Sequence, residues 1–289
     1  MEKDIIGNDP LIIRMTEYNL KKIYNSEIWK NFPEVKNKKV FIKPNLVTPP
    51  TQWDFQSITH PLILEAVLLK CIEGSPSQIV VGCCGFKGQW KRTIELSGYD
   101  KICQRYSCDL ICLQEGENFH KYSLIRFSDK EEYMSLFGTK ISDYLLEAEV
   151  GLNLSKMKVH SMARMTGSIK NMMGTISPKG AMHPKGSSDI LHKRLRDLYL
   201  LMKKYVSWNL MDGIIGSEYN EQYGVSKQAN VLISGKDMFE VDWAASQVMG
   251  MNPFEIPYLV YIRKRRNFQF DVPKYFVVPF EKPIGWKMV

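Results

Sequence analysis

The chain has 289 residues, of which 44% are hydrophobic and 24% are charged, and it contains no low-complexity tract. This length and composition are ordinary for a globular protein and are sufficient to bury a large core. The 39 lysine and arginine residues against 31 acidic residues give a net charge of +8. That surplus favours anionic partners but does not by itself indicate nucleic-acid binding.

Two kinds of targeting segment are missing from the pattern. No stretch approaches the roughly 18 consecutive apolar residues that a membrane span needs. Residues 1–7 lack the basic-then-apolar order of a secretory signal. We therefore expect a soluble, cytoplasmic protein without membrane association, folded as a single α/β domain over residues 1–289.

Short apolar runs and helical patterns follow one another along the chain. Strands are predicted at residues 39–43, 78–82, 109–113, 122–127, 149–154, 205–215 and 230–235. Helices are predicted from Thr59 onward, with Thr59 as N-cap and Pro61 in the first turn, and at residues 141–148, 188–204 and 237–249. Alternation of this kind predicts an α/β fold with a mainly parallel sheet and helices on both faces. The segment 122–127 is extra to that alternation and indicates a small antiparallel extension.

Polar residues gather where the predicted strands end. The ends are Lys43-Pro44-Asn45, residues 82–85, Lys156 to His160, Asp212-Gly213 and residues 235–237. Ligands of open α/β sheets bind outside the carboxyl ends of the strands. These five segments are therefore predicted to form one cleft, with residues 156–160 in a lysine-rich loop.

Lysine and histidine dominate this predicted cleft. Lysine is almost never fully buried without a partner, so Lys43 at the end of an apolar strand needs a partner or a ligand, and we expect it to contact the anion of the substrate. Neutral imidazole suits proton transfer. The residues predicted to be catalytic are His160, His183, Lys158 and Lys170. Those predicted to bind substrate are Lys43, Asn45, His60 and Asn171, whereas His120 and His192 are expected to be solvated.

The same histidines also suit a metal ion. His160, His183 and Asp212 together would offer the nitrogen and oxygen donors that iron, zinc or nickel accept. The alternatives for Asp212 are to orient a histidine or to form an ion pair with one of the lysines. The cysteines provide no comparable signal, because the six of them contain no CxxC pair and no ferredoxin-type spacing. We expect most of them to be reduced core thiols. The glycine-rich residues 82–88 match neither phosphate-loop pattern.

The ordered motifs resemble the domain of unknown function 362 family over about residues 38–255, which leaves residues 256–289 as a C-terminal extension. The matching segments are Ile42-Lys43-Pro44-Asn45-Leu46, Thr59-His60-Pro61, Lys156-x-Lys158-x-His160, Thr166-Gly167-x-x-Lys170-Asn171 with Gly174, His183, Asp212-Gly213, and Gly235-x-Asp237 with Asp242. The resemblance implies no single activity. Many members carry an additional ferredoxin-type segment that this sequence lacks, and Cys83-Cys84 stands where many members have an acidic residue.

These observations lead to one main functional hypothesis and two alternatives. The main one is an enzyme, of oxidoreductase or isomerase type, acting on a small carboxylate- or phosphate-bearing metabolite by acid/base or metal-assisted chemistry. One alternative is a non-catalytic protein that handles a metal or cofactor for a partner oxidoreductase. The other, nucleic-acid binding, is disfavoured because the sequence has no interleaved basic and aromatic strand motif. A homo-oligomer is left open.

Overall fold

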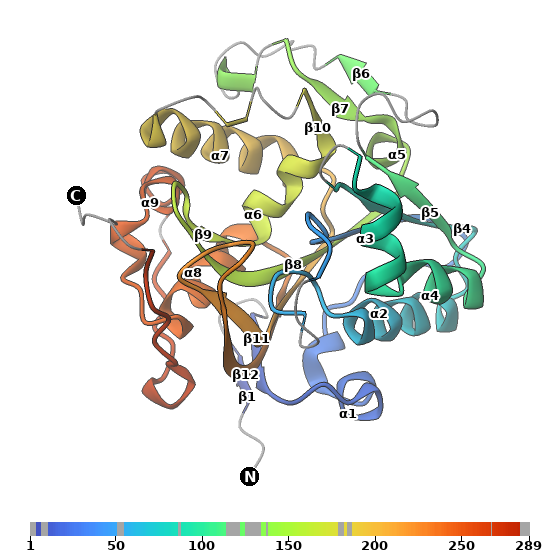
Figure 1. Cartoon of the computed structure of the whole chain (residues 1–289), viewed down its shortest axis with the longest axis horizontal. Helices are drawn as coiled ribbons and strands as arrows, with labels where there is room; N and C mark the ends of the chain where they lie inside the picture. Colours follow the sequence, from blue (N-terminus) through green and yellow to red (C-terminus); the bar gives the residue numbers. More distant parts are fainter. Residues whose placement is uncertain are drawn as a thin grey trace.

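The structure is a computed structural model that describes residues 4–6, 11–50, 55–85, 88–113, 122–124, 134–136, 138–178, 182–183, 187–266 and 268–283 (Figure 1). Its strands are β1 (Asp4–Ile6), β2 (Ile12–Met15), β3 (Lys39–Pro44), β4 (Gln78–Cys83), β5 (Asp109–Cys112), β6 (Tyr122–Leu124), β7 (Lys140–Ser142), β8 (Val150–His160), β9 (Arg164–Thr166), β10 (Ile176–Ser177), β11 (Trp208–Glu218) and β12 (Val225–Gly235). Its α-helices are α1 (Leu20–Tyr24), α2 (Pro61–Glu73), α3 (Trp90–Ser97), α4 (Tyr99–Arg105), α5 (Asp143–Leu146), α6 (Ser168–Asn171), α7 (Ser188–Met202), α8 (Met238–Val248) and α9 (Pro257–Arg263).

The central sheet is mainly parallel, as the sequence predicts. Its strand order is β1-β2-β12-β11-β8-β3-β4-β5, and β9 pairs with β8 outside this path. The neighbours from β11 to β5 run parallel, whereas β12, β2 and β1 add antiparallel pairs at the other side. The carboxyl ends of β3, β4, β8 and β11 therefore lie at one edge of the sheet.

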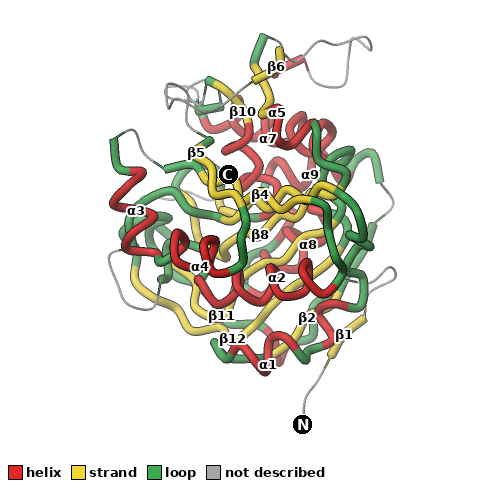
Figure 2. The backbone as a smooth tube through the Cα atoms, turned by 90° about the vertical axis from the view of Figure 1, so that its right-hand side faces the viewer, coloured by secondary structure: helices red, strands yellow, loops and turns green. Residues whose placement is uncertain are grey.

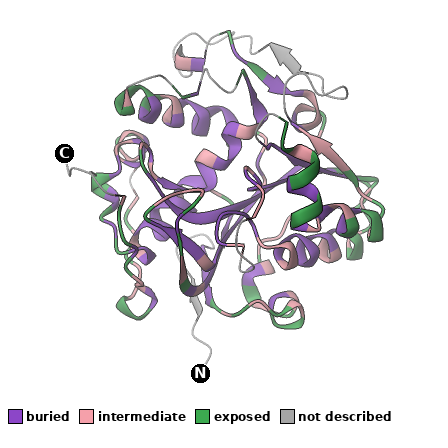
Figure 3. Cartoon of the chain, viewed as in Figure 1, coloured by how far each residue is buried: buried purple, intermediate pink, exposed green. Residues whose placement is uncertain are grey.

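Alternating side chains of the strands bury both faces of this sheet. Val40 and Ile42 of β3 pack into one core with α2, whereas Phe41 packs into a second core with α7 and α8. Figure 2 shows α2 and α4 over one face of the strands. Every residue of β8 is buried, and Figure 3 shows this strand in the buried colour. Apolar residues on both sides of the strands explain why the chain forms two helical layers.

A small antiparallel sheet, in the order β10-β7-β6, lies beside the main one and confirms the predicted extension. Its formation corrects one predicted helix. Residues 141–148 do not form a continuous helix, because Ile141 of β7 pairs with Ile176 of β10 and only Asp143–Leu146 is helical. The predicted strand 122–127 is observed as β6, and residues 125–127 lie outside the described residues.

The largest local difference concerns the lysine-rich segment. Residues 156–160 are not a loop but the second half of β8, because the chain turns back through β9 and pairs Lys158 with Thr166. β11 likewise extends to Glu218, beyond its predicted end. The strands β1 and β2 and the helices α3 and α4 were not predicted from the sequence pattern. In the described part of the chain, no helix is both long enough and apolar enough to cross a membrane.

Candidate functional site

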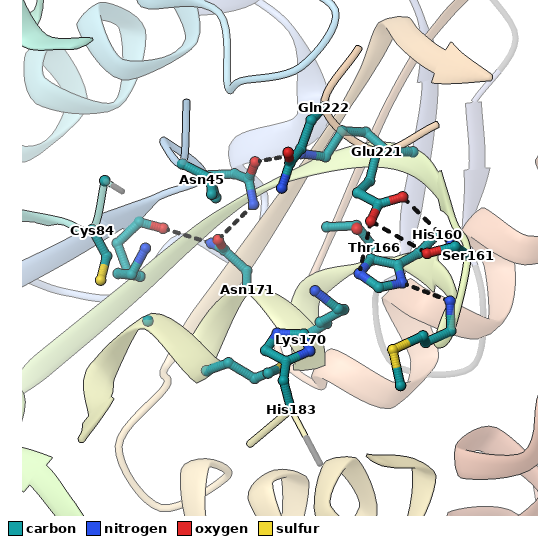
Figure 4. A pocket seen from close by; sticks show the side chains of 17 residues that line it. Asn45, Cys84, His160, Ser161, Thr166, Lys170, Asn171, His183, Glu221 and Gln222 are labelled. Carbon is teal, nitrogen blue, oxygen red and sulfur yellow. Dashed lines mark hydrogen bonds and ion pairs between the residues drawn. The ribbon is translucent and has the colours of Figure 1, made fainter. Parts of the chain in front are cut away.

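A pocket of about 550 Å³ opens where β3, β8 and α6 meet the turn between β11 and β12 (Figure 4). Its lining residues are Lys43, Asn45, Val47, Cys84, Gly85, Lys158, His160, Ser161, Met162, Thr166, Lys170, Asn171, Met173, Gly174, His183, Glu221 and Gln222. All four residues predicted to be catalytic lie in this pocket. Of those predicted to bind substrate, only His60 lies outside it.

Lys43 and Lys158 are buried, at 2% and 3% exposure. The Lys43 Nζ donates a hydrogen bond to the Pro44 carbonyl at 2.8 Å. The Lys158 Nζ donates to the Asn45 Oδ1 at 2.9 Å and to the Ser57 carbonyl at 2.8 Å. Burial, with a contribution from Lys170, lowers the pKa of Lys158 to about 7. A large fraction of this amine is therefore neutral near physiological pH.

Lys170 is the most available cation of the pocket. Figure 4 shows its side chain directed into the cavity, and its Nζ makes no hydrogen bond to the described part of the chain. Burial lowers the pKa of Lys170 to about 8, and the Glu221 carboxylate opposes that effect. Most Lys170 side chains are charged at pH 7, so this ammonium is placed to meet an anion.

His160 has a fixed tautomer. Its Nδ1 accepts hydrogen bonds from the backbone N–H groups of Met162 and Ala163, each at 3.1 Å. Because a backbone N–H only donates, the Nδ1 carries no proton and the neutral ring holds its proton on Nε2. The Nε2 lies 3.6 Å from the Glu221 Oε1. Burial, and then Lys170, holds the pKa of His160 well below its usual value.

This arrangement opposes the predicted acid/base role of His160. Taking up a proton on Nδ1 would break both hydrogen bonds to the turn after β8, and a neutral imidazole is a very weak acid. The ring is instead built to donate a hydrogen bond from Nε2. His160 is thus suited to stabilising negative charge on an oxygen atom of a ligand.

His183 also lines the pocket, close to His160. Its ring lies nearly parallel to that of His160, at an angle of 14° and with 6.3 Å between centroids. The residue as a whole is exposed, but its ring faces the cavity (Figure 4). Desolvation of the ring, and then Lys170, lowers the pKa of His183 to about 4. The ring is therefore neutral at pH 7.

Glu221 is a pocket residue that the sequence analysis missed. It lies in the turn between β11 and β12, outside every predicted element, and is the only acidic residue lining the described pocket. Its carboxylate accepts long hydrogen bonds, at 3.4 Å, from the backbone N–H and the Oγ of Ser161. No local signal marks a lone glutamate in a turn, since only the return of the β11–β12 hairpin brings it to His160.

Asp242 positions the helix that carries Lys170 and Asn171. Its buried carboxylate accepts hydrogen bonds from the backbone N–H groups of Ser168 and Ile169 at the start of α6. Burial raises the pKa of Asp242 to about 7, although these hydrogen bonds act in the opposite direction. A Cβ at Gly167 would overlap the Asp242 carboxylate. Glycine is thus required at position 167 by the close approach of this cap.

Gly174 makes room for Lys43. A Cβ at position 174 would lie 2.8 Å from the Lys43 Cε and 3.2 Å from its Nζ. Gly167 and Gly174 are therefore needed because a Cβ at either position would crowd a side chain of the site, and not because the backbone must be flexible there.

Asp212 lies outside the pocket, in a cluster with the buried Lys156 and the half-buried Tyr18 and His60. The Lys156 Nζ and the Asp212 Oδ2 form an ion pair at 2.9 Å, and both side chains are fully buried. The Tyr18 hydroxyl donates to the Asp212 Oδ1 at 2.8 Å. The ring of His60 stacks on Tyr18, and its Nδ1 accepts from the Leu62 N–H, so that His60 rather than Thr59 caps α2.

The predicted metal site with His160, His183 and Asp212 is therefore not assembled. β8 and β11 continue past Lys156 and Asp212, which places this pair inside the sheet rather than at its edge. Within the described ranges, no three His, Cys, Asp or Glu side chains are grouped closely enough to hold a metal ion.

Four of the six cysteines, and His192, are buried. All six cysteines are free thiols. Cys83 is fully buried in the core, which raises its pKa, whereas Cys84 lines the pocket. His192, expected to be solvated, is buried against Tyr258. His120 lies outside the described residues.

The sequence model of the domain of unknown function (DUF362) family matches residues 40–247. The chain belongs to this family. A curated relative, the thylakoid-associated protein sll1697 of Synechocystis sp., is 24% identical over 224 residues, which cover 76% of this chain and 65% of that protein. The match thus spans less than two thirds of the relative's length.

Two solved structures are also similar to this chain. One is a Thermotoga maritima protein from a structural genomics consortium, with a TM-score of 0.49 and 13% identity over 86% of this chain and 61% of that one. The other is the lactate racemase apoprotein from Thermoanaerobacterium thermosaccharolyticum, with a TM-score of 0.49 and 12% identity over 85% of this chain and 58% of that one.

Proposed function

We propose that this protein is an enzyme that binds a small carboxylate- or phosphate-bearing metabolite in the pocket and transfers a proton to or from it. The observation that supports this proposal is the charge of the pocket wall. Lys43, Lys158 and Lys170 converge on a cavity that holds Glu221 as its single described carboxylate. Buried cations carry a large desolvation cost unless an anion compensates them. A negatively charged substrate supplies that compensation.

The residues divide into binding and proton-transfer roles. Lys43 and the Lys170 ammonium hold the substrate anion, and the His160 Nε2–H donates to an oxygen that gains negative charge. The Lys158 amine is the base. When neutral, it has two N–H donors, which the Asn45 Oδ1 and the Ser57 carbonyl accept, so its lone pair is left to face the pocket.

Such a base suits proton removal from the carbon next to a carbonyl group. The proton moves to the Lys158 Nζ, which becomes an ammonium. The electron pair of the C–H bond forms a carbon–carbon double bond, and the π electron pair of the carbonyl group moves onto its oxygen. Lys170 and His160 stabilise that oxyanion. A pKa of about 7 is close to the value at which a general base works best at neutral pH.

Calorimetry with inorganic phosphate and with acetate tests the binding part of the proposal. In a Lys158→Ala, Lys170→Ala double variant we expect affinity to fall by roughly tenfold or more, because the charge-assisted contact of the Lys170 ammonium and the positive charge on the protonated fraction of Lys158 are both removed. Lys91, whose side chain is 90% exposed on α3, provides the control. Lys91→Ala should bind as the wild type does. Unchanged affinity in the double variant would refute the anion site.

Two replacements of His160 distinguish the role of its Nδ1 from that of its Nε2. Asparagine retains an acceptor near the position of Nδ1, and glutamine retains an N–H near the position of Nε2. We expect His160→Asn to keep the stability of the protein but to weaken phosphate binding by about fivefold or more. We expect His160→Gln to lose roughly 1–3 kcal/mol of unfolding free energy and to bind phosphate almost normally.

Nitrogen-15 NMR of the folded wild-type protein checks the same assignment directly. The Nδ1 of His160 should show the shift of an unprotonated ring nitrogen and the Nε2 that of a protonated one. The reverse pattern would contradict the donor role.

A further inference from the structure

A continuous chain of asparagine side chains leads away from the pocket through the sheet. The Asn45 Nδ2 donates to the Asn171 Oδ1 at 3.0 Å (Figure 4), and the Asn171 Nδ2 donates to the Asn153 Oδ1 at 2.8 Å. The Asn153 Nδ2 donates in turn to the Asn209 Oδ1 at 2.8 Å. All four side chains are at least 96% buried. They come from four separate segments: the end of β3, α6, β8 and β11.

The Lys158 amine at one end and backbone carbonyls, which can only accept, at the other end fix the direction of this asparagine chain. At the pocket end, the Lys158 Nζ donates to the Asn45 Oδ1. At the far end, the Asn209 Nδ2 donates to the backbone carbonyls of Gly235 at 3.3 Å and Lys236 at 3.1 Å. Every amide therefore has its oxygen toward Lys158 and its nitrogen toward β12.

Two further carbonyl groups hold the middle of the chain in the same direction. The Lys43 carbonyl accepts from the Asn171 Nδ2 at 2.9 Å, and the Ser168 carbonyl accepts from the Asn153 Nδ2 at 2.9 Å. Turning any one amide around would set nitrogen against nitrogen and oxygen against oxygen. In a buried, low-dielectric setting, aligned amides polarise one another and strengthen each bond.

We infer that Asn153 and Asn209 are positioning residues, which act through Asn171 and Asn45 to hold the Lys158 Nζ at the pocket wall. Neither residue lines the pocket, so neither touches a ligand. Their role rests on the proposed function only in that Lys158 is the group they serve. None of the charged and titratable groups around Lys158 belongs to the row of hydrogen-bonded asparagines. These groups are Lys43, Lys156, Lys170, His160 and Glu221.

A double-mutant cycle between Asn209 and Lys158 tests this coupling without any ligand. The variants are Asn209→Leu, Lys158→Met and their combination, with unfolding by urea as the readout at one pH. Sites without shared partners give additive changes, to within about a factor of two in the folding equilibrium constant. We expect the Asn209–Lys158 pair to deviate from additivity by about fivefold or more.

The matched control is Ser234 on β12. It is as buried as Asn209, and its Oγ donates to the Ile28 carbonyl outside the asparagine chain. The Ser234→Ala, Lys158→Met cycle should be additive. If Asn209→Leu does not fold, Asn209→Ser, which is too short to bridge the chain, replaces it. Additivity of the Asn209–Lys158 pair would overturn the inference.

Measuring the affinity for phosphate shows whether a negative result contradicts this inference or the proposed function. Asn209→Ser should weaken phosphate binding by about threefold or more, and Ser234→Ala should leave it unchanged. If the wild-type protein binds no phosphate, the proposed anion site is wrong. The double-mutant cycle measured by urea unfolding still decides whether the hydrogen-bonded asparagines hold Lys158 in place. Normal phosphate binding by Asn209→Ser would contradict the positioning role.

Discussion

Replacement of Lys158 by methionine should stabilise the protein at pH 6 while removing its proposed base. Burial depresses the pKa of Lys158 from 10.5 to about 7. Keeping the amine charged in the folded state at low pH therefore costs about 5 kcal/mol. Methionine avoids this cost but leaves the Asn45 Oδ1 and the Ser57 carbonyl without their donor, at about 1–3 kcal/mol each. With about 2 kcal/mol for each of these two acceptors, we expect a net gain of roughly 1 kcal/mol at pH 6.

The pH dependence distinguishes this effect from simple packing. The unfolded chain binds a proton at Lys158 up to about pH 10.5, whereas the folded chain loses it near pH 7. The wild type therefore becomes more stable relative to Lys158→Met as the pH rises from 7 toward 10.5. Urea unfolding at pH 6, 8 and 10 should show the advantage of the variant shrink and then reverse. The same series with Lys91→Met, which changes an exposed amine, should show no trend.

Replacement of Gly167 by alanine should be the most disruptive small change near the site. The backbone of Gly167 is extended and unstrained, with φ −137°. The cost comes from space, because the new Cβ overlaps the Asp242 carboxylate that caps α6. Moving this cap breaks its hydrogen bonds to Ser168 and Ile169 and shifts Lys170. We expect a loss of about 3 kcal/mol or more, together with weaker phosphate binding.

A second substitution shows whether the overlap is the cause. Serine at position 242 is shorter than aspartate and still able to cap a helix. The double variant Gly167→Ala, Asp242→Ser should be more stable than the sum of its two single changes allows. Gly235→Ala is the control, because its Cβ would meet its neighbours no closer than 3.3 Å. Strict additivity at positions 167 and 242 would exclude the overlap as the source of the loss.

The sequence by itself predicted the mainly parallel sheet and several of the residues that line the pocket. Apolar runs that end in polar residues are a local signal, because a strand buried on both faces must stop where its side chains meet solvent or a ligand. That signal placed Lys43 and Asn45 correctly at the end of β3. Residues of the segments 156–160 and 166–171 line the same pocket, although the first segment is a strand rather than a loop, whereas residues 212–213 and 235–237 of the predicted cleft do not line it.

Only the tertiary structure decided which polar residues face the pocket and which lie within the sheet. Asp212 pairs with Lys156 inside the sheet because β8 and β11 continue beyond the last residue of their apolar runs. These extensions depend on pairing partners from other segments, such as Thr166 of β9. Glu221 reaches His160 only through the hairpin of β11 and β12. Asn153 and Asn209 look like ordinary strand residues until the parallel register of β8 and β11 sets them side by side. Contacts between distant segments leave no periodicity in the sequence, so the asparagine chain had no signal from which it could be predicted.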